Sequence, residues 1–384
     1  MIQNILFVGH DANRAGAQIL LLRFLKLLKV YGKVQFSILL KHDGPLVEEY
    51  QSIAPTYILH QEKPLGLKSQ ILHKIKAKIG QSTTEINPVW QILAGKKFDL
   101  IVSNTFTNGD IFEELGQLNC PIYSYIHELR MGIEMYNGTP QAIENTLRGT
   151  QKFIACANSV KQNLLQQFGI SEQKIEILSS LLPESALAYQ ITETRVQALR
   201  HELGIPQDAF VVGGMGTIDL RKGTDLFLQL AHILREQNVY FLWVGGSHAQ
   251  NDFKIFSIDI QRLGISNIKF VETVSNPLDY LSVFDIFALT SREDPYPLVV
   301  LEAALLQKPM LCFEKAGGAQ DLIQTDAGMV VPYLSLEAMS KAILTLKENP
   351  ELSAEMGRIA RKKVLQRHST EKAFQEFLTI LGIA

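Results

Sequence analysis

The chain has 384 residues, more than one typical core contains, and this length predicts two domains of roughly 150–200 residues each. Hydrophobic residues make up 46% and charged residues 20%, as in an ordinary globular protein, and the net charge of -2 argues against a nucleic-acid partner. The three cysteines, Cys120, Cys156 and Cys312, lie apart in apolar stretches, which favours packing residues in a reducing compartment over a disulfide framework.

The first residues, "MIQNILFVGH", enter a strand-like pattern at once, so we expect no signal peptide. No apolar run in the sequence approaches the ~20 residues that a membrane-spanning helix needs. Both features favour a cytoplasmic protein.

Short apolar runs alternate with helical patterns, and they do so in two blocks. Runs that are apolar on both faces predict parallel strands covered by helices. The fold class expected is therefore α/β, with two doubly wound Rossmann-like domains. The predicted strands are residues 4–10, 34–40, 99–105, 121–127, 152–159, 210–216, 240–246, 268–273, 285–291, 309–313 and 328–332.

A polar stretch with little strand signal, residues 179–205, separates the two blocks. We expect one domain over residues 1–182 and a second over residues 183–366. Residues 367–384 predict a last helix whose expected place is back against the N-terminal domain.

Glycine-rich or polar loops follow several predicted strands. Ligands of doubly wound folds bind at the carboxyl ends of the strands, so five such loops favour a ligand cleft formed by both domains. These loops are residues 8–18, 213–223, 243–250, 289–297 and 313–321.

The most informative stretch is "SREDPYPLVVLEAA", residues 291–304. Its prolines cannot continue a sheet ladder, but they can lead from a strand into a helix. Asp294 then lies on the loop and Glu302 about one turn into the helix. The first helical amides, those of Leu298 and Val299, offer a phosphate site, and the two acids that bracket it can accept hydrogen bonds from sugar hydroxyls.

Extended to residue 309, this stretch resembles the signature of retaining glycosyltransferase family 4, whose members have the GT-B fold of two Rossmann-like domains facing across a cleft. The resemblance implies that residues 1–182 form an acceptor-binding domain and residues 183–366 a nucleotide-sugar-binding domain. The family has two glutamates separated by seven residues, with Gly-Phe-Gly after the first. Here Asp294 replaces the first glutamate, Pro-Tyr-Pro replaces the glycine-rich triplet, and Glu293 is an alternative first acid. The donor-binding residues implied by this motif are Glu293, Asp294, Tyr296, Pro297, Leu298, Val299 and Glu302.

Further motifs follow in the order of the family and extend the resemblance over most of the chain. "AGAQILLLRFLKLL" is similar to a stretch that places Gly16 and Ala17 near the donor phosphates, and "AGGAQDLI" to a loop in which Gly317 and Gly318 allow close backbone approach. "YIHEL" is similar to the motif whose histidine, here His127, contacts the donor sugar.

"DLRKGTDLFLQLA" resembles the loop whose lysine, here Lys222, neutralises the donor diphosphate. The family often has an arginine after the glycine that ends the first strand of the second domain. Thr217 stands there in this chain, and Arg221 is the nearby guanidinium.

The resemblance implies His127, Lys222 and Asp294 as catalytic residues, with front-face attack by the acceptor and proton transfer to the leaving phosphate. The sequence has no Asp-x-Asp pair and no clustered His/Cys signature, so we expect neither a metal nor another cofactor. Lys222, Arg221 and helix-end amides can stabilise the charge instead. The alternatives without a functional role are a solvated loop lysine at Lys222 and a structural salt bridge at Glu302.

The function expected is transfer of a sugar, with retention, from a nucleotide-sugar donor to a glycan or lipid-linked acceptor in cell-surface or exopolysaccharide biosynthesis. An alternative is a non-catalytic nucleotide-sugar-binding partner of another glycosyltransferase, because Thr217 and Asp294 depart from the family pattern. A related GT-B epimerase or phosphorylase is a third option.

Residues 63–80, "KPLGLKSQILHKIKAKIG", carry five lysines and no acid. A helix here would place its isoleucines on one arc with lysines beside it. Such a stretch either packs on its own domain or lies on an anionic bilayer, and the second option predicts a peripheral location on the inner face of the membrane.

Overall fold

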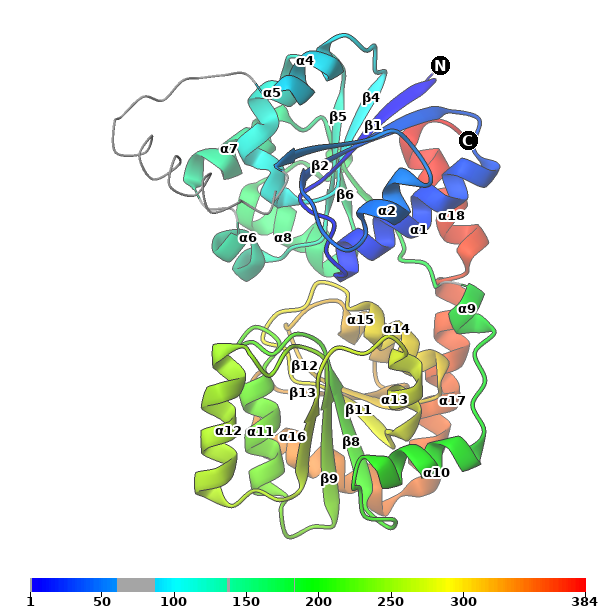
Figure 1. Cartoon of the computed structure of the whole chain (residues 1–384). Coiled ribbons are helices and arrows are strands. Elements are labelled where there is room, and N and C mark those ends of the chain that lie inside the picture. Colours follow the sequence, from blue (N-terminus) through cyan, green and yellow to red (C-terminus); the bar gives the residue numbers. More distant parts are fainter. Residues whose placement is uncertain (1, 61–86, 137–138, 183) are drawn as a thin grey trace, which may run out of the picture.

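The computed structural model describes residues 2–60, 87–136, 139–182 and 184–384 (Figure 1). The basic stretch 63–80, the candidate for membrane contact, lies outside these described residues.

The first half of the chain forms a seven-stranded parallel sheet in the order β3-β2-β1-β4-β5-β6-β7. β1 lies inside the sheet, where it pairs with β2 on one side and with β4 on the other. The strands are β1 (Asn4–Gly9), β2 (Gln35–His42), β3 (Thr56–His60), β4 (Leu100–Ser103), β5 (Ile122–Ile126), β6 (Lys152–Ala155) and β7 (Ile175–Ile177).

Helices connect these strands and cover the sheet (Figure 1). The α-helices are α1 (Gly16–Tyr31), α2 (Val47–Gln51), α4 (Pro88–Ala94), α5 (Phe112–Gly116), α6 (Arg130–Tyr136), α7 (Pro140–Gly149) and α8 (Asn158–Phe168). Two short 3-10 helices, η1 (Phe106–Ile111) and η2 (Glu172–Lys174), complete this half.

The second half repeats the plan with six parallel strands in the order β10-β9-β8-β11-β12-β13. The strands are β8 (Phe210–Met215), β9 (Val239–Val244), β10 (Ile268–Val271), β11 (Ile286–Leu289), β12 (Met310–Phe313) and β13 (Gly328–Val331). The helices are α9 (Glu184–Leu187), α10 (Glu193–Glu202), α11 (Thr224–Ile233), α12 (Asn251–Leu263), α13 (Pro277–Val283), α14 (Leu298–Leu305), α15 (Ala319–Ile323), α16 (Leu336–Glu348), α17 (Pro350–Arg367) and α18 (Thr370–Leu381).

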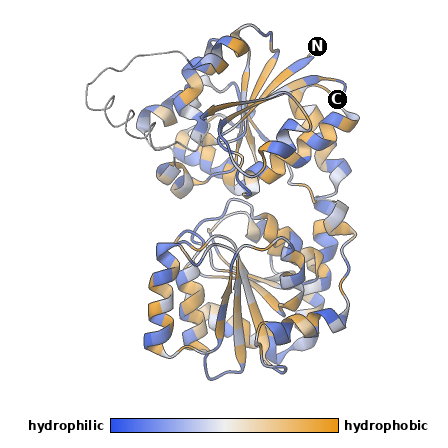
Figure 2. Cartoon of the chain, viewed as in Figure 1, coloured by the Kyte–Doolittle hydropathy of each residue, from blue (hydrophilic) through white to orange (hydrophobic). Residues whose placement is uncertain are grey.

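The central strands are apolar on both faces because helices cover both faces. All four residues of β4, of β11 and of β12 are buried. Figure 2 shows hydrophobic residues along the strands and polar residues on the outer helix surfaces. The expected α/β class with two doubly wound parallel sheets is therefore confirmed.

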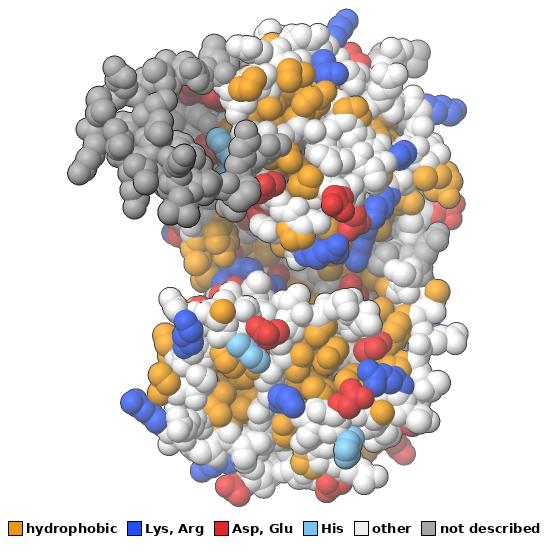
Figure 3. All heavy atoms as spheres, viewed as in Figure 1, with side chains coloured by type: hydrophobic (Ala, Val, Ile, Leu, Met, Phe, Trp, Pro, Cys, Tyr) orange, Lys and Arg blue, Asp and Glu red, His pale blue; other side chains and the backbone are white. Residues whose placement is uncertain are grey.

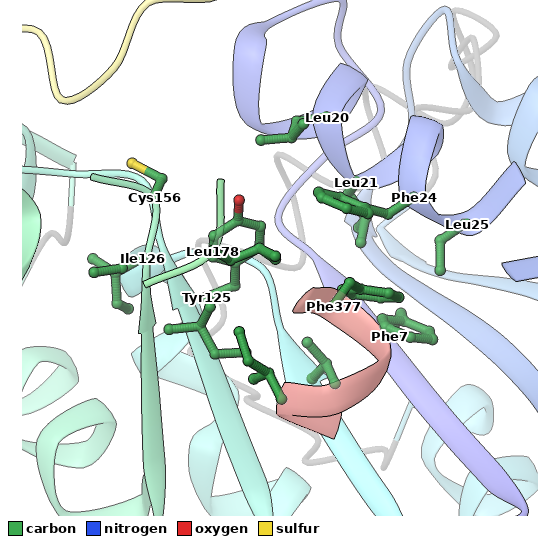
Figure 4. Packing of buried hydrophobic residues seen from close by; sticks show 14 of the residues in the cluster. Phe7, Leu20, Leu21, Phe24, Leu25, Tyr125, Ile126, Cys156, Leu178 and Phe377 are labelled. Atoms are coloured by element: carbon green, nitrogen blue, oxygen red, sulfur yellow. The ribbon is translucent and has the colours of Figure 1, made fainter. Parts of the chain in front are cut away.

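The last helix, α18, packs against the first sheet's core although it follows the second sheet in sequence. The Phe377 ring stacks on Phe24 of α1 at 4.7 Å between centroids and lies 6.2 Å from the Phe7 ring of β1 (Figure 4). We propose domain boundaries at residues 182 and 366. The packing of α18 on the core of the first sheet supports them.

Two edge strands, β3 and β7, were missing from the strands predicted above. Two of the three residues of β7 are exposed. β3 lies at the edge of its sheet, and four of its five residues are partly or fully exposed. An edge strand of this kind lacks the doubly apolar pattern by which the other strands could be recognised.

A buried histidine at the end of α17 makes a hydrogen bond to the segment that links the two sheets. His368 Nδ1 donates to the Ser180 carbonyl at 2.8 Å, and Tyr296 donates its hydroxyl to His368 Nε2 at 2.8 Å. Burial lowers the pKa of His368, which favours the neutral ring that this pattern requires. In the described ranges, no helix has both the length and the apolar character that a bilayer crossing demands.

Candidate active site

A cleft of about 910 Å³ lies where the carboxyl ends of both sheets face each other (Figure 3). The strand order reverses beside β1 in the first sheet and beside β8 in the second, and ligands of doubly wound folds bind at such points. Twelve of the residues expected from sequence line this cleft: Gly16, Ala17, His127, Arg221, Lys222, Glu293, Asp294, Tyr296, Pro297, Leu298, Val299 and Glu302.

Lys222 and Asp294 meet because their loops follow neighbouring strands, β8 and β11. The Lys222 ammonium lies 2.5 Å from Asp294 Oδ2, and both side chains are mostly buried. The lysine loop ends at Gly223, whose φ is +68° and where a Cβ would stand 1.9 Å from the Thr290 carbonyl oxygen. Glycine at this position therefore lets the two loops approach and brings the cation to the acid.

Arg221 and Glu293 lie beside this pair but have different surroundings. Arg221 Nη1 donates to the backbone carbonyl of Glu293 at 3.0 Å. The Glu293 carboxylate accepts the backbone N–H groups of Met131 and Gly132, at 2.8 and 2.9 Å, from the start of α6. Glu293 thus bridges the two halves of the protein, whereas Asp294 is the acid that contacts the lysine.

Glu302 lies on α14 with only 15% of its side chain exposed. Burial raises the pKa of Glu302, and the nearby Arg23 opposes that rise. Arg23 Nη2 is 3.7 Å from Glu302 Oε1, which is longer than a hydrogen bond. The contact is thus a long ion pair, and Glu302 lines the cleft, where its carboxylate can accept hydrogen bonds from a ligand.

His127 follows β5 and is positioned by Asn104 at the end of β4. The Asn104 amide nitrogen donates to the Ala17 carbonyl at 3.1 Å, which orients Oδ1 toward His127 Nε2, 3.1 Å away. Nε2 therefore carries the proton. Burial, followed by the nearby His10, lowers the pKa of His127 to about 3, so the ring is neutral and its Nδ1 is a hydrogen-bond acceptor.

Sequence reasoning missed the residues that hold His127 in place. The Glu128 carboxylate accepts the His127 backbone N–H at 2.9 Å and the Phe106 backbone N–H at 3.2 Å. It also accepts the hydroxyl of Thr105. Asn104 and Thr105 follow β4, and His127 and Glu128 follow β5. Since the carboxyl ends of adjacent parallel strands lie side by side, these positions could have predicted the contacts.

Three expected residues do not line the cleft. Thr217 donates its hydroxyl to Asp219 at 2.6 Å, within the lysine loop. Gly317 and Gly318 lie behind the loop that carries Asp294: a Cβ on Gly317 would stand 1.8 Å from the Asp294 carbonyl oxygen, and one on Gly318 2.5 Å from that of Pro295. The two glycines thus support the acid's backbone.

We expect Gly317→Ala to lower the midpoint of thermal unfolding by at least about 6 °C, because the φ of +142° and the overlap with Asp294 both oppose a side chain. Gly264→Ala is the matched control. Gly264 also has a positive φ, +62°, but a Cβ there meets nothing within 4 Å. It should cost about 1 kcal/mol, or about 2–4 °C. Equal shifts in differential scanning fluorimetry would contradict the supporting role of Gly317.

Across the described ranges, no three His, Cys, Asp or Glu side chains come together as a metal-binding set. The charged groups that line the cleft include the Arg221 and Lys222 cations and the Asp294 and Glu302 acids.

Residues 196–363 match the family described as glycosyl transferases group 1. This range contains the motifs around Lys222, Asp294 and Glu302 on which the family resemblance of the second half rests. Over its whole length the chain has the GT-B fold, since it superposes on Anabaena Alr3699/HepE, solved in complex with UDP and glucose, with a TM-score of 0.80. That match covers 99% of both chains at 21% identity.

Curated relatives match over shorter stretches. The alpha-galactosylglucosyldiacylglycerol synthase of Streptococcus pneumoniae is 26% identical over 215 residues, which is 55% of this chain and 55% of that protein. The poly(ribitol-phosphate) alpha-N-acetylglucosaminyltransferase of Staphylococcus aureus is 24% identical over 45% of this chain and 35% of that protein. The chain thus spans about half the length, or less, of these two relatives.

Proposed function

We propose that this protein is a retaining glycosyltransferase that takes a sugar from a nucleotide-sugar donor bound in the cleft between its two sheets. The observation that carries the proposal is the Lys222–Asp294 pair beside the carboxylate of Glu302, in a chain with the GT-B fold. The cation and the acids lie on loops and a helix of a segment that matches glycosyl transferases group 1.

Each group has a role that its surroundings support. The donor diphosphate lies against Lys222, Arg221 and the first amides of α14, which have no acceptor within their own helix. When the bond from the sugar to the phosphate breaks, the negative charge that develops on the leaving oxygen is stabilised by these groups. Glu302 accepts hydrogen bonds from ribose hydroxyls.

His127 binds a hydroxyl of the transferred sugar through Nδ1. Because the ring is neutral, it does not repel the positive charge that develops on the sugar as the bond breaks. A neutral acceptor suits an oxocarbenium-like centre better than an imidazolium would.

The acceptor that we propose is a glycan or lipid-linked molecule of the cell surface, bound on the side of the cleft formed by the first sheet. The names of the curated relatives, which include a galactosylglucosyldiacylglycerol synthase and a poly(ribitol-phosphate) N-acetylglucosaminyltransferase, support this class. Membrane contact through residues 63–80 is part of the same proposal and rests on their lysine content.

The test is a panel of UDP-glucose, UDP-galactose, GDP-mannose and dTDP-glucose, measured by thermal shift and by release of the nucleoside diphosphate. A donor at 100 times its dissociation constant should add about 2.7 kcal/mol to the free energy of unfolding. Stabilisation without release in the presence of candidate acceptors would favour the non-catalytic partner. No stabilisation by any member would contradict a site for these donors.

Activity should survive an excess of EDTA, because Lys222 and Arg221 supply the positive charge that a bound metal ion supplies in metal-dependent glycosyltransferases. The same release assay checks this, with a magnesium-supplemented sample as the control. Complete loss on chelation, restored by magnesium or manganese, would show that the cationic loop does not suffice.

A further inference from the structure

One ion pair in the cleft joins the two halves of the protein. Arg23 lies on α1 against the first sheet, and Glu302 lies on α14 against the second. Arg23 Nη2 is 3.7 Å from Glu302 Oε1, and the two side chains are only 18% and 15% exposed. Both residues line the cleft.

Arg23 is itself held in place by the segment between the sheets. Its Nη1 donates to the Leu181 carbonyl at 3.3 Å. The guanidinium therefore contacts α14 and the connecting segment at once, and its place depends on how the two halves are arranged.

The charge of Arg23 matters to Glu302 because burial works against an ionised carboxylate there. Burial raises the pKa of Glu302, and Arg23 is the charged group that lowers it again. α17 also packs on α14, but its Arg361 donates to the Leu305 carbonyl at the far end of that helix. In the part of the chain that the structure describes, Arg23 is thus the counterion of Glu302.

We propose that Arg23 is a positioning residue for the donor: as the counterion that reaches Glu302 from the other half of the protein, it holds the carboxylate in place for the donor hydroxyls when the two halves are in this arrangement. The inference rests on the proposed function. It makes the donor contacts of Glu302, which lies on the second half of the chain, dependent on a side chain of the first.

The experiment compares wild type, Arg23→Met, Arg23→Lys and Lys26→Met, using the member of the panel that stabilises the wild type most. The pH dependence of donor KM and of kcat is measured between pH 5.5 and 9. Lys26 is the matched control, since it is a cation of the same helix that pairs with Glu49 and not with Glu302.

Arg23→Met should raise the pH midpoint for donor binding by about one unit or more, the usual effect of an opposite charge at this distance. Donor KM should rise about tenfold at pH 6 and at most threefold at pH 9, while kcat changes less than KM. Arg23→Lys should restore the wild-type midpoint, and Lys26→Met should leave it unchanged.

A purely structural arginine would lower thermal stability without moving the midpoint, and that result would overturn the proposal. So would failure of lysine to restore it. If Arg23→Met does not fold, Arg23→Gln provides the same comparison. If the wild type binds donor and transfers sugar but the variants keep its pH midpoint, this inference alone is rejected. If the wild type binds no donor, the proposed function is rejected.

Discussion

Lys222→Ala is expected to lower kcat for sugar transfer about 100- to 1,000-fold, the effect of removing one preorganised group that stabilises charge in the transition state. The ammonium is mostly buried and lies on a loop that Gly223 fixes against the strand beside it. The position of the ammonium is thus set before a donor binds. The measurement is steady-state transfer at saturating donor.

The matched control is Lys315→Ala, a lysine on the loop after β12 with 82% of its side chain exposed. It should change kcat less than twofold. Because Lys222→Ala also leaves Asp294 buried without its partner, the variant Lys222→Met/Asp294→Asn separates the two effects. It should recover stability but not activity, and recovery of transfer would contradict the role of Lys222.

Glu302→Gln is expected to raise the donor KM at least tenfold, because hydrogen bonds to a charged group contribute about 1.5–3 kcal/mol and the amide presents a single neutral acceptor. Glu337→Gln on α16 is the control, with 79% of its side chain exposed and an ion pair to Lys341 on the same helix. It should leave KM unchanged. Donor titrations at pH 7.5 check both, and an unchanged KM for Glu302→Gln would remove this residue from the donor site.

Glu302→Gln should also remove the pH dependence of donor affinity and of stability that comes from the titration of Glu302. The pKa of Glu302 is raised in the folded protein, so wild-type donor affinity should fall as the pH drops through that raised value. The contribution of Glu302 to the free energy of unfolding changes with pH in the opposite direction. A raised carboxyl pKa contributes stability that is present below the usual Glu value of about 4.3 and lost as the pH rises through the folded pKa. Glu302→Gln should show neither trend.

The two sheets could be predicted from sequence because their strands are buried on both faces and carry a continuous apolar signal. Asp294, Glu302 and Lys222 were found by motif and spacing, and the strand order then brings their loops together in the structure. The edge strand β3 was missed, since an exposed edge lacks that signal.

What could not be predicted are the contacts that cross between the halves. Arg23 precedes Glu302 by 279 positions, and Glu293 caps a helix 161 residues earlier in the chain. No local pattern encodes such pairs, because they depend on how two separately folded sheets face each other. Gly317 and Gly318 were recognised as sites of close approach, but the backbone that they approach is the protein's own.

The most direct test of a donor site formed by both halves is hydrogen–deuterium exchange of the intact protein, with and without the best-binding nucleotide sugar of the panel. We predict slower exchange in residues 216–223 and 293–302 of the second half and in residues 16–23 of the first, and no slowing at saturating donor for the outer helix α12. A donor that stabilises the protein but leaves these three segments unchanged, or protects only a surface outside the cleft, would contradict the account.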